Sequence, residues 1–338
     1  MEQRDTNISN RVESIFDTHL FVGLWKLIFT NKCRHNGQLH VMQSLQHHAR
    51  FTIYKNNVDY SDVKPYLDFG LPNVEVIERM RHQNTKDPND GLKISAAVGC
   101  MTSLNFFKSI GATDVDSAMV AAATGGHIEM IKQCKDWGAK GFARAMTKAV
   151  DKGHIDILVL LKKWGTPCTW NICLIASYQG HYDIVKLLLE WNVHCVDFCM
   201  GYAAVQGHIN IVRLCIENGA TCYEGTILKA AACGRIEIIK MFKERGLIDT
   251  YLEDAMVEAA RYGHVDIVAL CKEYGAVRFD DALQAAIRSD DCKNACKIKL
   301  LQLFREWKVD VNLDKAIKNV LNDDEIKDFL IEWKSTLA

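Results

Sequence analysis

A glycine-histidine pair returns along this chain at a fixed interval, and this interval limits the folds available to the chain. Four pairs stand 27 residues apart, a Gly-Arg pair keeps the interval once more, and the last pair follows 29 residues later: Gly126-His127, Gly153-His154, Gly180-His181, Gly207-His208, Gly234-Arg235 and Gly263-His264. A short unit repeated at a constant period predicts a stacked solenoid, in which each unit packs mainly against its two neighbours.

Each copy of the unit is predicted to hold two short helices. The first carries adjacent small residues, such as Ala203-Ala204 and Ala230-Ala231, which allow neighbouring helices to approach closely. The second has the spacing of a helix with one buried stripe, for example Ile184, Leu187 and Leu188. Seven copies can be aligned between about residues 91 and 276, so the sequence predicts an all-α helix-turn-helix array.

This pattern of small residues, Gly-His, apolar pairs and a closing Gly-Ala resembles the ankyrin repeat. The period of 27 is shorter than the common period of about 33, and the Thr-Pro-Leu-His signature is absent. The resemblance therefore implies an ankyrin-type solenoid whose hairpin fingers are shortened or absent. Endings such as Lys135-Asp136-Trp137-Gly138-Ala139 are most similar to those of ankyrin-type arrays in large amoeba-infecting DNA viruses of the marseillevirus-like group.

The flanking segments fit the repeat less well. We expect an N-terminal helical cap region or a degenerate repeat over 1–60, a degenerate repeat over 61–90, regular ankyrin-type repeats over 91–288, and an atypical repeat with capping helices over 289–338. Within the last segment, Glu325–Trp333 is predicted to form a final helix whose charges cover the exposed end of the stack.

The recurring histidines and cysteines are the residues that could suggest chemistry. Equivalent histidines in stacked repeats lie roughly 10 Å apart, too far to share a metal, so we interpret them as structural residues that orient the turn by local hydrogen bonds. The predicted structural turn consists of Gly126, His127, Gly153, His154, Gly180, His181, Gly207, His208, Gly263 and His264. The tryptophans at 137, 164, 191, 307 and 333 are interpreted as a packing ladder.

The 13 cysteines are interpreted as reduced thiols. Cys134, Cys215 and Cys271 fill a slot that leucine or phenylalanine fills in other copies, which indicates small core hydrophobes. Cys195 and Cys199, like Cys292 and Cys296, are spaced to share a helix face, but no Cys-x-x-Cys motif occurs. The sequence therefore predicts no metal and no cofactor.

Composition excludes several functional classes. Lysine and arginine number 41 against 42 acidic residues, a formal charge of −1, whereas a surface for duplex nucleic acid needs a positive excess or stripe. No apolar run approaches the roughly 18–20 residues of a membrane span, and the N-terminus lacks signal-peptide character. Motifs of nucleotide-binding, hydrolase and kinase sites are absent from the sequence. We expect an intracellular, non-enzymatic monomer without a nucleic-acid or membrane partner.

The remaining candidate for function is the variable face of the first helices. Positions 10, 6 and 3 residues before each histidine slot share one helix face, because their spacing is i, i+4, i+7. The predicted partner-binding residues on it are Arg144, Lys148, Asn171, Ile175, Tyr178, Phe198, Tyr202, Val205, Lys229 and Glu258. The resemblance implies that this face lines the concave side, and an alternative interpretation is that the helices are rotated so that these residues pack against their neighbours.

Three functional hypotheses follow. The first is a scaffold that binds a partner protein through this face, because aromatic and apolar side chains among charges are typical of binding hot spots. The second is a structural component of a virion or another assembly. The third is an enzyme, which is disfavoured because the polar residues at fixed spacing have structural explanations. The resemblance to viral ankyrin proteins also implies a substrate adaptor to the host ubiquitin machinery, although neither end of the chain shows a clear F-box-like module.

Overall fold

The computed structural model describes residues 73–85, 87–193, 195–320 and 323–337. These residues form helices and no strand, which confirms the predicted all-α class. They fall into two compact units, the first ending at Gly141 and the second beginning at Phe142. The N-terminal region predicted over 1–60 lies outside the described residues.

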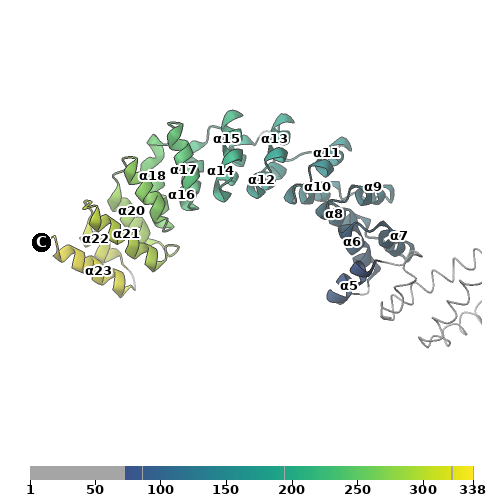
Figure 1. The fold of residues 1–338 in the computed structure, drawn as a ribbon, viewed down its shortest axis with the longest axis horizontal. Helices are drawn as coiled ribbons and strands as arrows, with labels where there is room; N and C mark the ends of the chain where they lie inside the picture. The colour runs from purple at the N-terminus through teal and green to yellow at the C-terminus, as the bar shows by residue number, and fades with distance from the viewer. Residues whose placement is uncertain (1–72, 86, 194, 321–322, 338) are drawn as a thin grey trace, which may run out of the picture. The chain divides into compact units, whose positions relative to one another are not determined.

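The first unit contains five described helices (Figure 1). They are α5 (Val74–His82), α6 (Pro88–Val98), α7 (Met101–Ser109), α8 (Val115–Gly125) and α9 (Ile128–Asp136). Helix α6 packs on α7 and α8, and α8 packs on α9. Two helix pairs, α6 with α7 and α8 with α9, therefore stack side by side, and α5 packs on α6.

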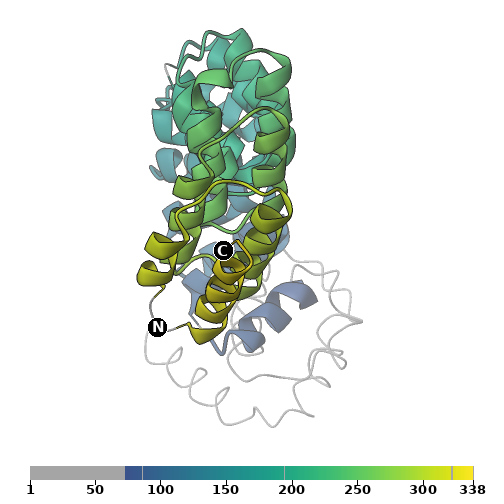
Figure 2. The ribbon, with the colours of Figure 1, turned by 90° about the vertical axis from the view of Figure 1, so that its left-hand side faces the viewer.

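The second unit continues the same pairing along the chain (Figure 1). Its elements are α10 (Phe142–Asp151), α11 (Ile155–Lys163), α12 (Trp170–Gln179), α13 (Tyr182–Glu190), α14 (Val196–Gln206), α15 (Ile209–Glu217), α16 (Tyr223–Ala232), α17 (Ile236–Glu244), the 3-10 turn η2 (Asp249–Tyr251), α18 (Leu252–Arg261), α19 (Val265–Glu273), α20 (Phe279–Arg288), α21 (Asn294–Glu306), α22 (Leu313–Asn319) and α23 (Asp324–Ser335). Figure 2 shows this unit from the end that carries its C-terminal helices.

The even-numbered helices α10 to α20 form one row, in which each helix packs on the next. The odd-numbered helices form the second row, and each packs on the first helix of its own repeat. The small residues predicted to permit close approach are buried throughout the first row, for example Ala203, Ala204 and Ala230. In the second row, Ile184, Val185 and Leu188 of α13 are buried. The small residues of the first helices and the apolar residues of the second helices are therefore buried between neighbouring repeats.

The glycine of each Gly-His pair ends the first helix. Gly180 has a φ of 81°, its N–H donates to the Ala176 carbonyl, and the His181 N–H donates to the same carbonyl at 2.9 Å. This left-handed residue after the helix satisfies carbonyl groups that the last turn leaves free, and glycine adopts it at the lowest cost. The second helix then begins directly after the histidine.

Four histidine side chains make hydrogen bonds to another repeat in place of the local hydrogen bonds predicted from the sequence. Each described bond instead reaches the preceding repeat, where the acceptor is the carbonyl two residues before that repeat's glycine. The Nε2···O distances are 3.0 Å for His127 to Ala97, 3.2 Å for His181 to Asp151, 3.0 Å for His208 to Tyr178 and 2.8 Å for His264 to Ala232. Nε2 donates in this arrangement, since a carbonyl oxygen only accepts. The prediction of local hydrogen bonds is wrong for these four histidines, because each of their rings lies against the preceding repeat.

Arginine replaces histidine in one repeat and makes the same hydrogen bond to the preceding repeat. Arg235 Nε donates to the Val205 carbonyl at 2.8 Å, and Val205 stands two residues before Gly207. The Gly-Arg pair is therefore equivalent to Gly-His in its contact with the preceding repeat.

The histidine ring of one repeat also explains why the preceding repeat has glycine in its Gly-His pair. A Cβ atom placed on Gly180 would lie 2.5 Å from the His208 ring, and one placed on Gly153 would lie 2.9 Å from the His181 ring. The glycine of one repeat thus contacts the histidine of the next. The two residues of a Gly-His pair therefore face different neighbours: the glycine faces the following repeat and the histidine faces the preceding one.

Of the five tryptophans predicted to form a ladder, four end second helices, namely Trp137, Trp164, Trp191 and Trp307, whereas Trp333 is buried within α23. Trp137 and Trp191 are half-buried, and a lysine from the preceding repeat lies over each ring: Lys108 Nζ is 5.7 Å from the Trp137 centroid and Lys162 Nζ is 5.5 Å from the Trp191 centroid. Such cation-π contacts contribute about 0.5–1 kcal/mol each at exposed sites. The ladder therefore joins repeats at their outer edge.

The C-terminal end departs from the repeat. The predicted last helix is present as α23, which buries Ile326, Leu330 and Trp333 and packs on α21 and α22. Helix α22 lies within the segment predicted to hold capping helices, but its bounds are not predicted from the sequence. Its Asn319 side chain donates to Gln284 Oε1 of α20 at 2.7 Å. The array thus ends in a helix pair whose charged outer side includes Lys327 and Asp328.

A pair of glycine substitutions separates backbone strain from the contact with histidine. Gly165 and Gly180 have φ values of 86° and 81°, but a Cβ on Gly165 meets no atom within 4 Å. We expect Gly165→Ala to cost about 1–2 kcal/mol of unfolding free energy from φ alone. Gly180→Ala should cost at least about 1 kcal/mol more, because the methyl group overlaps the His208 ring. Urea denaturation followed by circular dichroism measures both.

The double variant Gly180→Ala with His208→Ala is the control for this prediction. Compared with His208→Ala alone, so that the lost hydrogen bond from His208 to Tyr178 cancels, the added Gly180→Ala should cost about as much as Gly165→Ala, since the smaller side chain removes the overlap while the φ strain persists. Equal costs for Gly165→Ala and Gly180→Ala would contradict the contact.

Candidate protein-binding surface

The predicted variable face is accessible in the structure. Of the ten residues predicted to bind a partner, seven are exposed and three are half-buried, and none is buried. The exposed residues are Arg144, Lys148, Asn171, Tyr178, Phe198, Tyr202 and Lys229; the half-buried residues are Ile175, Val205 and Glu258. The alternative interpretation, in which rotated helices bury these side chains, does not describe this arrangement.

The helices hold this face outward for a simple reason. In α14, Cys199, Ala203 and Ala204 are buried, so the opposite side of the same helix faces solvent. Phe198 and Tyr202 lie on that side at spacing i, i+4. Helix α12 buries Ile172, Cys173, Ala176 and Ser177 in the same way. Because α12 and α14 pack on each other, their outward faces belong to one continuous surface.

Four exposed aromatic side chains concentrate on these two helices, and we call them the aromatic surface: Trp170, Tyr178, Phe198 and Tyr202. Their exposed fractions are 56%, 43%, 64% and 39%. Aromatic side chains provide a large apolar area with few rotatable bonds, so they contribute strongly when a partner covers them.

Trp170 is the member of this surface that the sequence analysis missed. It occupies a repeat position that carries an oxygen acceptor in other repeats, as in Asp116, Asp197 and Glu253. Asp197 Oδ1 accepts from the backbone N–H groups of Thr221 and Cys222 at 2.7 and 2.8 Å. Asp116 binds two loop N–H groups of the next repeat in the same manner. Tryptophan at this position cannot accept such bonds, and this exception was the available signal.

Charged side chains border the aromatic surface. Lys229 Nζ of α16 lies 5.7 Å from the centroid of the Tyr202 ring. Glu258 of α18 pairs with Arg261 at 3.3 Å, while Arg144 and Lys148 stand exposed on α10. Because α10, α12, α14, α16 and α18 form one packed row, the predicted residues lie along a single strip of the second unit.

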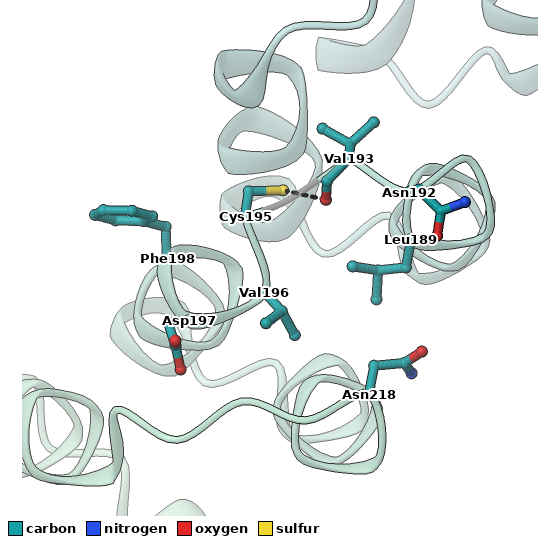
Figure 3. A pocket seen from close by; sticks show the side chains of 8 residues that line it. All are labelled: Leu189, Asn192, Val193, Cys195, Val196, Asp197, Phe198 and Asn218. Atoms are coloured by element: carbon teal, nitrogen blue, oxygen red, sulfur yellow. Dashed lines mark hydrogen bonds between the residues drawn. The ribbon is translucent and has the colours of Figure 1, made fainter.

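A shallow pocket opens beside the aromatic surface, at the start of α14 (Figure 3). Its volume is about 400 Å³, and its lining is Leu189, Asn192, Val193, Cys195, Val196, Asp197, Phe198 and Asn218. Figure 3 shows the Phe198 ring directed away from Leu189 and Asn218, so the ring stands clear of the far wall. The Cys195 thiol donates to the Val193 carbonyl at 3.4 Å.

Most buried cysteines behave as the predicted core hydrophobes. Burial raises the pKa of Cys134 and of Cys271 to about 12, so both thiols stay protonated at neutral pH. Three others lie together, namely Cys173, Cys195 and Cys199, and this group could hold a metal. Hydrogen bonds with Cys173 and Cys195 lower the pKa of Cys199, whereas hydrogen bonds with Cys195 and Cys199 raise that of Cys173. The sequence predicts only the Cys195 and Cys199 pair, because Cys173 belongs to the preceding repeat.

The fold and this surface define a helical repeat protein with an accessible variable face. Residues 172–254 match the family model of ankyrin repeats in three copies. The crystal structure of the human ASB11 ankyrin repeat domain matches over 72% of this chain and 96% of that chain, at 16% sequence identity and a TM-score of 0.35. A search of curated proteins found no match. The family matched over residues 172–254 is a repeat family and is not a catalytic one. No helix in the described part of the chain is long and apolar enough to cross a membrane.

Two residues at the same repeat position provide a matched prediction. Asp197→Ala removes the acceptor of two backbone hydrogen bonds, so we expect a loss of about 1–2 kcal/mol in unfolding free energy. Trp170→Ala removes an exposed ring, and we expect a change within about 0.5 kcal/mol. Chemical denaturation measures both values, and a larger loss for Trp170→Ala than for Asp197→Ala would show that the ring is a packing residue.

Proposed function

We propose that this protein is a non-enzymatic scaffold that binds a partner protein through the aromatic surface and the charged residues around it. The rigid row of helices presents side chains at fixed positions, and no chemical step is required. The ankyrin repeats matched over 172–254 support the proposal, since such repeats are generally protein-protein interaction modules, and this range contains Tyr178, Phe198 and Tyr202.

The observation that carries the proposal is the exposure of four aromatic rings on two adjacent repeats. In a monomer, isolated exposed apolar residues are common, but a cluster of large rings keeps a substantial apolar area in water. These rings remain in water after folding, so a partner that covers them removes apolar surface from water and gains hydrophobic free energy of binding. The charges of Arg144, Lys148, Lys229 and Glu258 would then form a polar rim that selects among partners.

The chain offers no comparable argument for a nucleic-acid partner. Its formal charge is −1, and acidic residues such as Glu258 lie on the same strip as the lysines. Counterion release, which dominates nucleic-acid binding, needs a concentrated positive surface.

Free thiols support a reducing compartment. Twelve cysteines of the described chain are unpaired, a state that is typical of the cytoplasm and rare in secreted proteins. We therefore propose an intracellular location; the marseillevirus-like source and the virion or ubiquitin-adaptor roles stay predictions from the resemblance.

The double variant Tyr178→Ala with Tyr202→Ala tests the proposed surface. We expect it to reduce capture of the partner at least about 30-fold, because two central aromatic hot spots together contribute about 2 kcal/mol or more. Quantitative mass spectrometry after affinity purification identifies the partner, and calorimetry with the purified partner then measures the change in Kd.

Tyr182→Ala is the matched control for this experiment. Tyr182 has the same exposed fraction as Tyr202, 39%, but lies on the second helix α13. It should bind the partner normally. A double variant that melts well below the wild type would show that the tyrosines support the fold, and unchanged binding by a folded double variant would exclude the surface. Concentration-dependent assembly of the purified chain, blocked by the same substitutions, would favour the structural-assembly role.

A further inference from the structure

We propose that Cys173, Cys195 and Cys199 form a binding site for a thiophilic divalent ion, of which zinc is the biological example. Their three sulfur atoms all lie within 4.8 Å of one another, and all three residues are buried. The Sγ atoms of Cys195 and Cys199 are 3.5 Å apart. Zinc bound tetrahedrally at about 2.3 Å from each sulfur separates its ligands by about 3.8 Å. The sulfurs therefore reach zinc-binding positions with small movements.

The site exists because two repeats place cysteine at unusual positions. Cys173 occupies the repeat position that holds Met119, Met146 and Met200 in other copies, and its shorter side chain leaves space there. Cys199 occupies a position held by Ala118, Ala145 and Ala255. The thiols of Cys173 on α12 and Cys199 on α14 therefore lie close to each other.

Cys195 adds the third ligand from the residue before α14. It is the N-cap residue of that helix and also lines the pocket of about 400 Å³ described above (Figure 3). Of the three cysteines, Cys195 alone lines this pocket, so an ion that enters through the pocket would approach the group from the side of Cys195. An entry path and a defined ligand set are both requirements of a genuine metal site.

The donor set selects the type of ion. Three thiolates are soft ligands that suit zinc or its heavier relatives and do not suit magnesium or calcium, which require oxygen. A divalent ion leaves the three-thiolate site with one net negative charge, whereas a monovalent ion would leave two. Since burying charge is costly, the divalent ion fits better.

The experiment uses cadmium as a spectroscopic probe, because thiolate-to-cadmium charge transfer absorbs in the ultraviolet. Full-length protein is reduced, exchanged into oxygen-free buffer and titrated with Cd²⁺ alone. We expect one tight equivalent with charge-transfer absorption, zinc competition for the same site, and a metal-dependent rise in Tm. Cys195→Ser should weaken this binding more than about 100-fold, since loss of an outer partner alone costs about 10–100-fold.

Cys195→Ser and Cys222→Ser form a matched pair. Cys222 stands one repeat of 27 residues later and is the N-cap residue of α16, but it is exposed and outside the group of three sulfurs. Serine is a favoured N-cap residue, so both variants should fold. Retained cadmium binding in Cys222→Ser with its loss in Cys195→Ser supports the site. Equal titrations of the two variants and the wild type, or oxidation of Cys195 and Cys199 to a disulfide that zinc does not protect against, would overturn it.

Discussion

The hydrogen bond from a histidine of one repeat to the preceding repeat, which His127, His181, His208 and His264 make, is the interaction on which the rest of this array depends. It joins a ring nitrogen at the start of one second helix to a carbonyl at the end of the previous first helix, as in His208 to Tyr178. Such a carbonyl has lost its helical partner, because the last four carbonyls of a helix have none within the helix. The ring therefore completes one helix while it fixes the distance to the next repeat. Arg235 preserves the bond with a different chemical group.

The position of the acceptor is set by the glycine turn of the preceding repeat and not by a constant number of residues between donor and acceptor. His264 lies 32 residues after its acceptor Ala232, whereas His208 lies 30 residues after Tyr178. Both acceptors stand two residues before a glycine, so the two additional residues are absorbed elsewhere, in the segment that contains the turn η2. Gly263 is not faced by a histidine of the following repeat; Cys292 and Cys296 lie at that place instead. The regular repeat ends there, where the chain enters its atypical C-terminal helices.

Features that recur in every repeat could be predicted from the sequence. Contacts between residues at different positions of neighbouring repeats could not. The period predicted the two helices of each unit, the glycine turn and the outward side of the first helices. Periodicity is silent about contacts between different repeat positions, so the target of the histidines was placed locally. Cys173 was overlooked as a neighbour of Cys199 because their positions differ within the repeat. Helix α22 has seven residues, which leaves too short a pattern for the sequence to give its bounds.

The same inter-repeat bond explains how the binding face can vary without loss of the stack. The acceptors are backbone carbonyls, and two of them belong to Tyr178 and Val205, whose side chains lie on the proposed binding face. A carbonyl is present whatever the side chain, so substitution at these positions changes the surface and keeps the hydrogen bond. Asp151 and Ala232 provide the same acceptor with unrelated side chains. The structural requirement is thus met by the backbone of the first helix, and its outward side chains are free to specify a partner.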